Sequence, residues 1–266
     1  MKTRVISAAI ALLIFIPIFF HGGTIFHLAI WLLSVLGLKE IIHAYETEKE
    51  LPIFIKVVSY VVMSILLLVN HDIDTIRFGI DFKIITGIFL IYLVPAILYH
   101  DEKIYSIKDA FTLIGMIFFL GTAFELLVFV RDLSLKLIIF LFLISIFTDT
   151  FAYITGLLIG KHKLIEEVSP NKTIEGFVGG TVMGIFISSF YYITVINPEV
   201  RISSIIITTL FLSIIGQLGD LVFSAIKRHY KIKDFSNLMP GHGGVLDRFD
   251  SILFILLGFM YFINII

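Results

Sequence analysis

Residues 202–223 read ISSIIITTLFLSIIGQLGDLVF, an apolar run long enough to cross a lipid bilayer as one α-helix. Its one acid, Asp220, stands near the end of the run, where a charge is costly unless it serves a function. Similar runs recur near residues 5–21, 24–38, 52–70, 83–99, 110–130, 135–159, 176–196 and 250–266. The chain is therefore predicted to be an all-α, polytopic integral membrane protein with about nine transmembrane helices.

The composition agrees with a chain covered mostly by lipid. Of the 266 residues 58% are hydrophobic and 15% are charged, which lies outside the range of soluble domains. The absence of cysteine excludes disulfides, thiolate metal sites and cysteine nucleophiles. The net charge of -1 says nothing about acidic partners, because the charges are confined to loops. Among the partners we expect membrane lipid and no nucleic acid.

The first two apolar runs are short for spanning helices. A re-entrant hairpin turning at His21-Gly22-Gly23 is the alternative, and it would leave about seven full spans. With the N-terminus in the cytoplasm, fifteen of the 20 lysines and arginines fall in cytoplasmic loops, as the positive-inside rule requires. The loops near 160–175 and 224–249 then face the cytoplasm from the inner or plasma membrane.

Polar residues that could carry chemistry are concentrated in the second half of the chain. We therefore divide the sequence into N-terminal membrane helices, residues 1–100, and a catalytic membrane region, residues 101–266, that includes both loops. The sequence contains no internal repeat that would mark two transporter-like halves.

One helical face gathers an acid and two bases. Asp220, Ser224, Lys227 and Arg228 follow Gln217 at helical spacing, so their side chains point the same way. Alternatively, Asp220 simply pairs with Arg228 or Arg248 to tolerate burial, as intramembrane charges often do.

Asp247 opens the next span, and a glycine-rich turn lies between it and Asp220. The turn allows both carboxylates to approach one cation, and hard oxygen ligands without a His or Cys cluster favour Mg²⁺. Within that turn, Gly241, Gly243 and Gly244 could bring backbone N–H groups close to phosphate oxygens. His242 could donate to a phosphate, although an ordinary interhelical turn would also contain such glycines.

A second group of polar residues lies upstream. Asp149, Tyr153, Gly156 and Gly160 follow helical spacing and line a groove of small residues. Small residues at this spacing mainly let helices pack closely, but an acid inside a span is a functional candidate. Lys172 precedes a helix N-terminus, a position that suits an anion.

These motifs together resemble the phosphatidate cytidylyltransferase (CDP-diacylglycerol synthase) family over roughly residues 145–255. The main match is Ser224-x-Ile226-Lys227-Arg228-x4-Lys233-Asp234-x-Ser236-x2-Met239-Pro240-x-His242-Gly243-Gly244-x2-Asp247-Arg248-Phe249-Asp250. The upstream segments Asp149-x2-Ala152-Tyr153-x2-Gly156 and Ser169-Pro170-Asn171-Lys172-Thr173-x-Glu175-Gly176 match in the same order.

The resemblance implies transfer of a cytidylyl group from CTP to phosphatidate, giving CDP-diacylglycerol and pyrophosphate in phospholipid biosynthesis. It implies that Asp220 and Asp247 bind the catalytic Mg²⁺. A second, monovalent or divalent, cation is a further option. It also implies a homodimer.

We assign the phosphates to the backbone of Gly241–Gly244 with Lys227, Arg228 and Arg248, since a transfer between polyanions depends on positive charge. Asp250 could orient Arg248 or join the metal shell. The remaining pocket residues, with unresolved roles, are Asp149, Tyr153, Lys172, Ser224 and His242.

Two other functions are consistent with parts of this pattern. A CTP-dependent transferase acting on an isoprenoid lipid would need similar groups. Product analysis would separate phosphoryl transfer to a polyprenol, and lipid competition would separate cytidylyl transfer to an ether lipid phosphate. A transporter could use Asp149, Glu125 and Asp220 as an ion pathway, but the polar groups gather toward one face instead.

Overall fold

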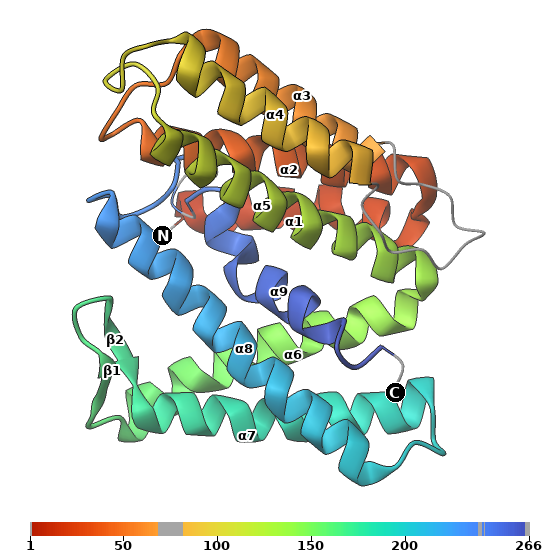
Figure 1. The fold of residues 1–266 in the computed structure, drawn as a ribbon. Coiled ribbons are helices and arrows are strands. Elements are labelled where there is room, and N and C mark those ends of the chain that lie inside the picture. Colours follow the sequence, from red (N-terminus) through yellow and green to blue (C-terminus); the bar gives the residue numbers. More distant parts are fainter. Residues whose placement is uncertain (1, 69–81, 239–240, 242, 264–266) are drawn as a thin grey trace. The chain divides into compact units, whose positions relative to one another are not determined.

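A computed structural model describes residues 2–68, 82–238, 241 and 243–263 of the chain. These residues form two compact units (Figure 1). The first contains residues 1–125 together with the loop 235–245, and the second contains residues 126–234 and 246–266. The segment 235–245 thus belongs to the first unit, although the segments before and after it in sequence belong to the second. The division at residue 100 was predicted from the location of candidate catalytic residues, and it stays a prediction.

The first unit is helical. Its elements are α1 (Lys2–His21), α2 (Gly23–Tyr45), α3 (Ile53–Leu68), α4 (Phe82–Leu98) and most of α5 (Ile107–Leu133). Polar side chains join neighbouring helices inside this apolar unit: the indole of Trp31 donates to Ser64 Oγ at 2.9 Å, and the Tyr92 hydroxyl donates to Ser59 Oγ at 2.7 Å. Such bonds hold helices together in lipid, where apolar contact alone gives little preference.

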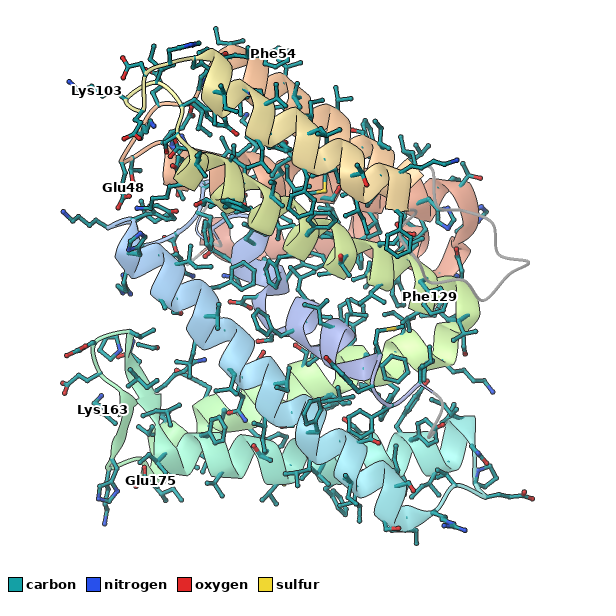
Figure 2. All side chains as sticks on the ribbon, in the orientation of Figure 1. Glu48, Phe54, Lys103, Phe129, Lys163 and Glu175 are labelled. Carbon is teal, nitrogen blue, oxygen red and sulfur yellow. The ribbon has the colours of Figure 1, made fainter. Side chains whose placement is uncertain are left out.

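Charged groups of the first unit gather at one end of its helices, where Figure 2 labels Glu48 and Lys103. Lys49 donates to the carbonyl of Glu102 at 2.6 Å and pairs with the buried carboxylate of Asp109, which also accepts from Tyr45. This cluster fixes the start of α5 against the end of α2.

The second unit combines four helices with a small sheet. Its helices are α6 (Leu135–Ile159), α7 (Ile174–Tyr191), α8 (Ile202–His229) and α9 (Leu246–Phe259), and a π-helical turn at Tyr192–Ile196 extends α7. Between α6 and α7, β1 (Lys163–Ile165) and β2 (Ser169–Thr173) pair as an antiparallel hairpin. Lys163 and Glu175 mark this polar end of the unit in Figure 2.

Small residues set the distance between α6 and α7. A Cβ atom on Gly180 would lie 2.5 Å from the carbonyl oxygen of Thr148, and one on Gly176 would lie 2.6 Å from that of Ala152. Only glycine permits so close an approach of two helix backbones. Small residues therefore allow α6 and α7 to pack closely, as one of the two interpretations of the groove on α6 predicted.

Five helices of the described residues are long and apolar enough to cross a membrane, with α3 and α4 as shorter apolar helices. The chain is an integral membrane protein, as predicted. The count of nine or seven spans, and the hairpin at Gly22, stay predictions.

Two sequence boundaries need correction. The fold is helical but includes the β1–β2 hairpin, in the segment predicted as the loop 160–175. The loop predicted at 224–249 is shorter, because α8 continues to His229 and α9 already begins at Leu246. Asp247 and Asp250 consequently lie in the first turns of a helix.

Candidate active site

An ion pair joins the hairpin to α8. Lys172 Nζ, on β2, lies 2.6 Å from Asp220 Oδ2, and about a quarter of each side chain is exposed. The Ser224 hydroxyl, one turn further along α8, donates to Asp220 Oδ1 at 3.3 Å. The charge partner of Asp220 is thus Lys172, where the sequence had suggested Arg228 or Arg248. Ser224 lies on the same helical face, as predicted.

A cavity of about 200 Å³ opens beside this pair. Asp149 and Tyr153 reach it from α6. The other residues that line it are Ala152, Leu164, Lys172, Thr173, Gly176, Phe177, Gln217 and Asp220. Two acids, one ammonium and one phenol, all predicted as site residues, therefore share one cavity.

Gln217 shapes the inner wall of the cavity. Its side-chain amide donates to Thr181 Oγ1 at 2.8 Å and to the carbonyl of Phe177 at 3.3 Å, both on α7. These bonds satisfy a buried amide and fix α8 against α7. Gln217 is thereby a positioning element of the site.

A second ion pair joins α8 to α9. Lys227 donates to Asp247 Oδ1 at 2.7 Å, and the two side chains are 12% and 3% exposed. The helices pack closely here because Gly219 leaves room for the ring of Phe254. The lysine and aspartate predicted at this site are thus in direct contact, in a more buried setting than Lys172 and Asp220.

Three carboxylates converge from three helices. Asp149 on α6, Asp220 on α8 and Asp250 on α9 lie within electrostatic range of one another. Lys172 acts on Asp149, and Lys227 acts on Asp250, through space. Neighbouring carboxylates disfavour one another's charged form, and nearby cations offset this repulsion. We expect this group of carboxylates to favour a bound cation, and that role stays a prediction.

Hydrogen bonds at the base of the hairpin hold Lys172 in place. Thr173 caps α7 by accepting from the backbone N–H of Gly176 at 3.1 Å. Glu175 accepts from the backbone N–H groups of Lys161 and His162, at 3.1 and 3.2 Å, and its other oxygen contacts His162 Nδ1 at 2.6 Å. Residues at a helix N-terminus commonly satisfy free N–H groups in this way.

The other predicted site residues are not all placed at the cavity. Arg228 donates from Nε to the carbonyl of Val168 at 3.3 Å, which ties α8 to the turn of the hairpin. Arg248 is exposed on the first turn of α9. Gly241, Gly243 and Gly244 lie in the segment 235–245 of the first unit, while His242 lies outside the described residues. Their roles in binding phosphate stay predictions.

The donor chemistry is compatible with a magnesium ion shared with substrate. Among the described residues, no three His, Asp or Glu side chains form a complete metal site. Mg²⁺ is usually held by one or two carboxylates, with waters and substrate phosphates completing its shell. Asp220 and Asp247 each contact a lysine in the structure, and their joint Mg²⁺ site stays a prediction.

Sequence reasoning missed several residues of the site. Leu164, Thr173 and Phe177 line the cavity without carrying a charge that would draw attention. The helix N-terminus predicted after Lys172 is confirmed, and Thr173 is its cap. The hairpin had no comparable signal, because its strands are short and mostly polar.

Comparison with known proteins identifies the family. The model of the cytidylyltransferase family matches residues 2–266. The chain belongs to the cytidylyltransferase family. Its members in the comparison include proteins named phosphatidate cytidylyltransferase from Staphylococcus saprophyticus, 36% identical over 256 residues, and Staphylococcus haemolyticus, 38% identical over 257 residues. A third, from Staphylococcus aureus, is 36% identical over 260 residues.

Each of these alignments covers 96% of both chains. The cytidylyltransferase family predicted from residues 145–255 is confirmed, and the match extends over the N-terminal helices that carried no recognisable motif. The protein is accordingly a nucleotidyltransferase enzyme.

Proposed function

We propose that this cytidylyltransferase moves a cytidylyl group from CTP to phosphatidate, releasing pyrophosphate and forming CDP-diacylglycerol. The observation that carries the proposal is the cavity at the Lys172–Asp220 pair, which combines cationic and anionic groups at the polar end of apolar helices. Relatives that align over nearly the whole chain bear the name of this activity.

The chemistry requires little acid–base assistance from the protein. The phosphate of phosphatidate has a second pKa of about 6, so at neutral pH an oxygen is already deprotonated. That oxygen attacks the α-phosphorus of CTP and forms a new P–O bond. The bond from this phosphorus to the bridging oxygen breaks, and pyrophosphate leaves with the electron pair.

The barrier comes from bringing two polyanions together and from charge building on the pyrophosphate. Lys172 and Lys227 are the cations placed to meet this charge, since each already pairs with a carboxylate that can be exchanged for a phosphate. Asp220 and Asp247 would hold Mg²⁺, which supplies electrostatic stabilisation of the phosphates when bound. Asp149 and Tyr153 line the pocket and would orient the substrate.

The active site is proposed to face the cytoplasm, where CTP is available, because positive loops are retained on that side. The diacyl tails would enter sideways from the bilayer, leaving the phosphate head at the interface. The homodimer, which the family resemblance implies, and a second cation belong to the same proposal.

The direct test uses protein purified in detergent with phosphatidate and CTP labelled with ³²P at the α-phosphate. Lipid-soluble label should form with Mg²⁺ and fail to form with EDTA. Label that forms equally in EDTA would overturn the metal assignment. No label from folded protein and phosphatidate would overturn the proposed substrate.

A further inference from the structure

Glu40 is a buried acid far from every motif of the sequence. It lies near the end of α2 and is 5% exposed, in a helix otherwise suited to lipid. A buried carboxyl is costly unless hydrogen bonds satisfy it. Two of its hydrogen-bond partners come from the loop 235–245, about two hundred residues away in sequence and in the same compact unit.

One carboxyl oxygen of Glu40 ties together both ends of this loop. Ser236 Oγ donates to Glu40 Oε1 at 2.6 Å, and the backbone N–H of Val245 donates to the same oxygen at 2.8 Å. The Ser236 hydroxyl in turn accepts from the N–H of Leu238 at 3.2 Å. The loop is thus closed by a side chain that the loop itself does not contain.

Buried apolar residues lie next to both hydrogen bonds of Glu40. Phe235 and Val245, at the two ends of the loop, are 2% and 1% exposed. Glu40 therefore acts inside a dry environment, where a hydrogen bond is stronger than in water and an unsatisfied group is more costly. Loss of this buried acceptor should therefore disturb the loop more than loss of an exposed hydrogen bond would.

The glycine before Val245 fits the same contact. A Cβ atom on Gly244 would overlap the Glu40 carboxyl group. Any larger residue at 244 would have to push Glu40 aside, and the displaced carboxyl could no longer accept from both Ser236 and Val245. Gly244 is therefore needed to leave room for the Glu40 carboxyl group, whether or not it also contacts a phosphate.

We propose that Glu40 is a positioning residue for the nucleotide, which holds Ser236 and Val245 at the two ends of the loop that carries Gly241, Gly243 and Gly244. This inference rests on the proposed function and on the assignment, made from the sequence, of the CTP phosphates to the N–H groups of Gly241, Gly243 and Gly244. Val245 is also two residues before Asp247 in sequence, so the anchored end of the loop leads directly into the first turn of α9.

The test compares steady-state kinetics of Glu40→Ala and Glu40→Gln with wild type. Glu40→Ala should raise KM for CTP about tenfold, the effect expected for losing one to two buried hydrogen bonds. Glu40→Gln keeps an oxygen acceptor, so its KM for CTP should lie between those of wild type and Glu40→Ala. A purely structural role would reduce the amount of active enzyme and lower the apparent kcat with KM unchanged, which would contradict the proposal.

A double-mutant cycle isolates the contact between Glu40 and Gly244. Gly244→Ala should raise KM for CTP about as much as Glu40→Ala, because it displaces the same carboxyl group. The KM for CTP of the double variant should lie within about threefold of the KM of either single variant, since the effects of substituting two residues in contact are not additive. Multiplication of the two effects would show that Gly244 acts separately from Glu40.

The matched control is Asp109→Ala, which removes another buried carboxyl of the same unit, one that pairs with Lys49. It should lower the unfolding temperature and leave KM for CTP unchanged.

Hydrogen exchange gives a readout that does not need activity. Peptides covering 235–245 should exchange faster in Glu40→Ala than in wild type or in Asp109→Ala. Unchanged exchange in Glu40→Ala would contradict the inference, even if the wild-type enzyme proved to use another lipid.

Discussion

Lys172 Nζ and Asp220 Oδ2 lie 2.6 Å apart across the mouth of a cavity, one on a hairpin strand and the other on a membrane helix. Both side chains retain access to the cavity, so the pair can open when a more highly charged ligand arrives. We expect the phosphates of the substrate to take Lys172, which leaves the Asp220 carboxylate available to a cation. Substrate binding would thus convert the ion pair into one lysine that contacts phosphate and one carboxylate that can bind a cation.

Asp220→Asn should lower turnover by at least about 100-fold, comparable to the loss of one major electrostatic stabiliser. The amide keeps the size of the side chain but not its charge, so binding of a cation is weakened. The measurement is kcat of purified, folded enzyme under saturating substrate. Lys108→Ala, an exposed change on α5 outside all motifs, serves as the control and should have little effect. Wild-type turnover in Asp220→Asn would disprove the role of this carboxylate.

Lys172→Gln should reduce kcat/KM for CTP and phosphatidate by about tenfold or more, because a charge-assisted contact is lost from the cavity. Lys172→Arg keeps the positive charge and should retain most of the activity. Initial rates over a range of both substrate concentrations would separate the two variants. Equal losses in both would mean that the shape of the lysine matters more than its charge.

Lys227→Met should destabilise the protein by about 3 kcal/mol, because it leaves the buried Asp247 carboxylate without the Lys227 ammonium. Adding Asp247→Asn should recover part of that stability without restoring turnover. Thermal unfolding of each variant in the same detergent provides the comparison. A double variant that unfolds at a lower temperature than Lys227→Met would show that the pair is not the source of the effect.

Gly180→Ala should lower both stability and activity, since its Cβ atom would meet the carbonyl oxygen of Thr148 on α6. The backbone of α6 cannot move aside locally, so the two helices would have to separate. Gly115→Ala on α5 is the matched control, because a Cβ atom there meets nothing within 4 Å. Unfolding temperature and activity should be unchanged in the control, and a similar loss in both variants would refute the packing argument.

The membrane character and the family could be predicted from sequence because each depends on local pattern. Apolar runs set the helices, and the spacing from Ser224 to Asp250 is long enough to identify the family. Helical spacing also placed Asp220 and Ser224 on one face of α8, where the structure has them in contact.

The pairing of charges could not be predicted, because it depends on how distant elements pack. Lys172 reaches Asp220 only because the hairpin folds toward α8, and the hairpin is stabilised by Glu175 and Thr173 at its base. Glu40 was missed for the same reason, since nothing in its neighbourhood on α2 indicates that it accepts from Val245. Long-range contacts between single polar residues leave no periodic signal in the sequence.

The central claim is cytidylyl transfer to phosphatidate, and the most direct measurement follows the two ends of CTP in parallel reactions. One reaction contains CTP labelled at the α-phosphate and the other contains CTP labelled at the γ-phosphate, each with phosphatidate and Mg²⁺. The proposed function predicts that the α-label enters the lipid phase as CDP-diacylglycerol, while the γ-label leaves as pyrophosphate. Label from the γ-phosphate in the lipid, with none from the α-phosphate, would contradict it and indicate phosphoryl transfer instead.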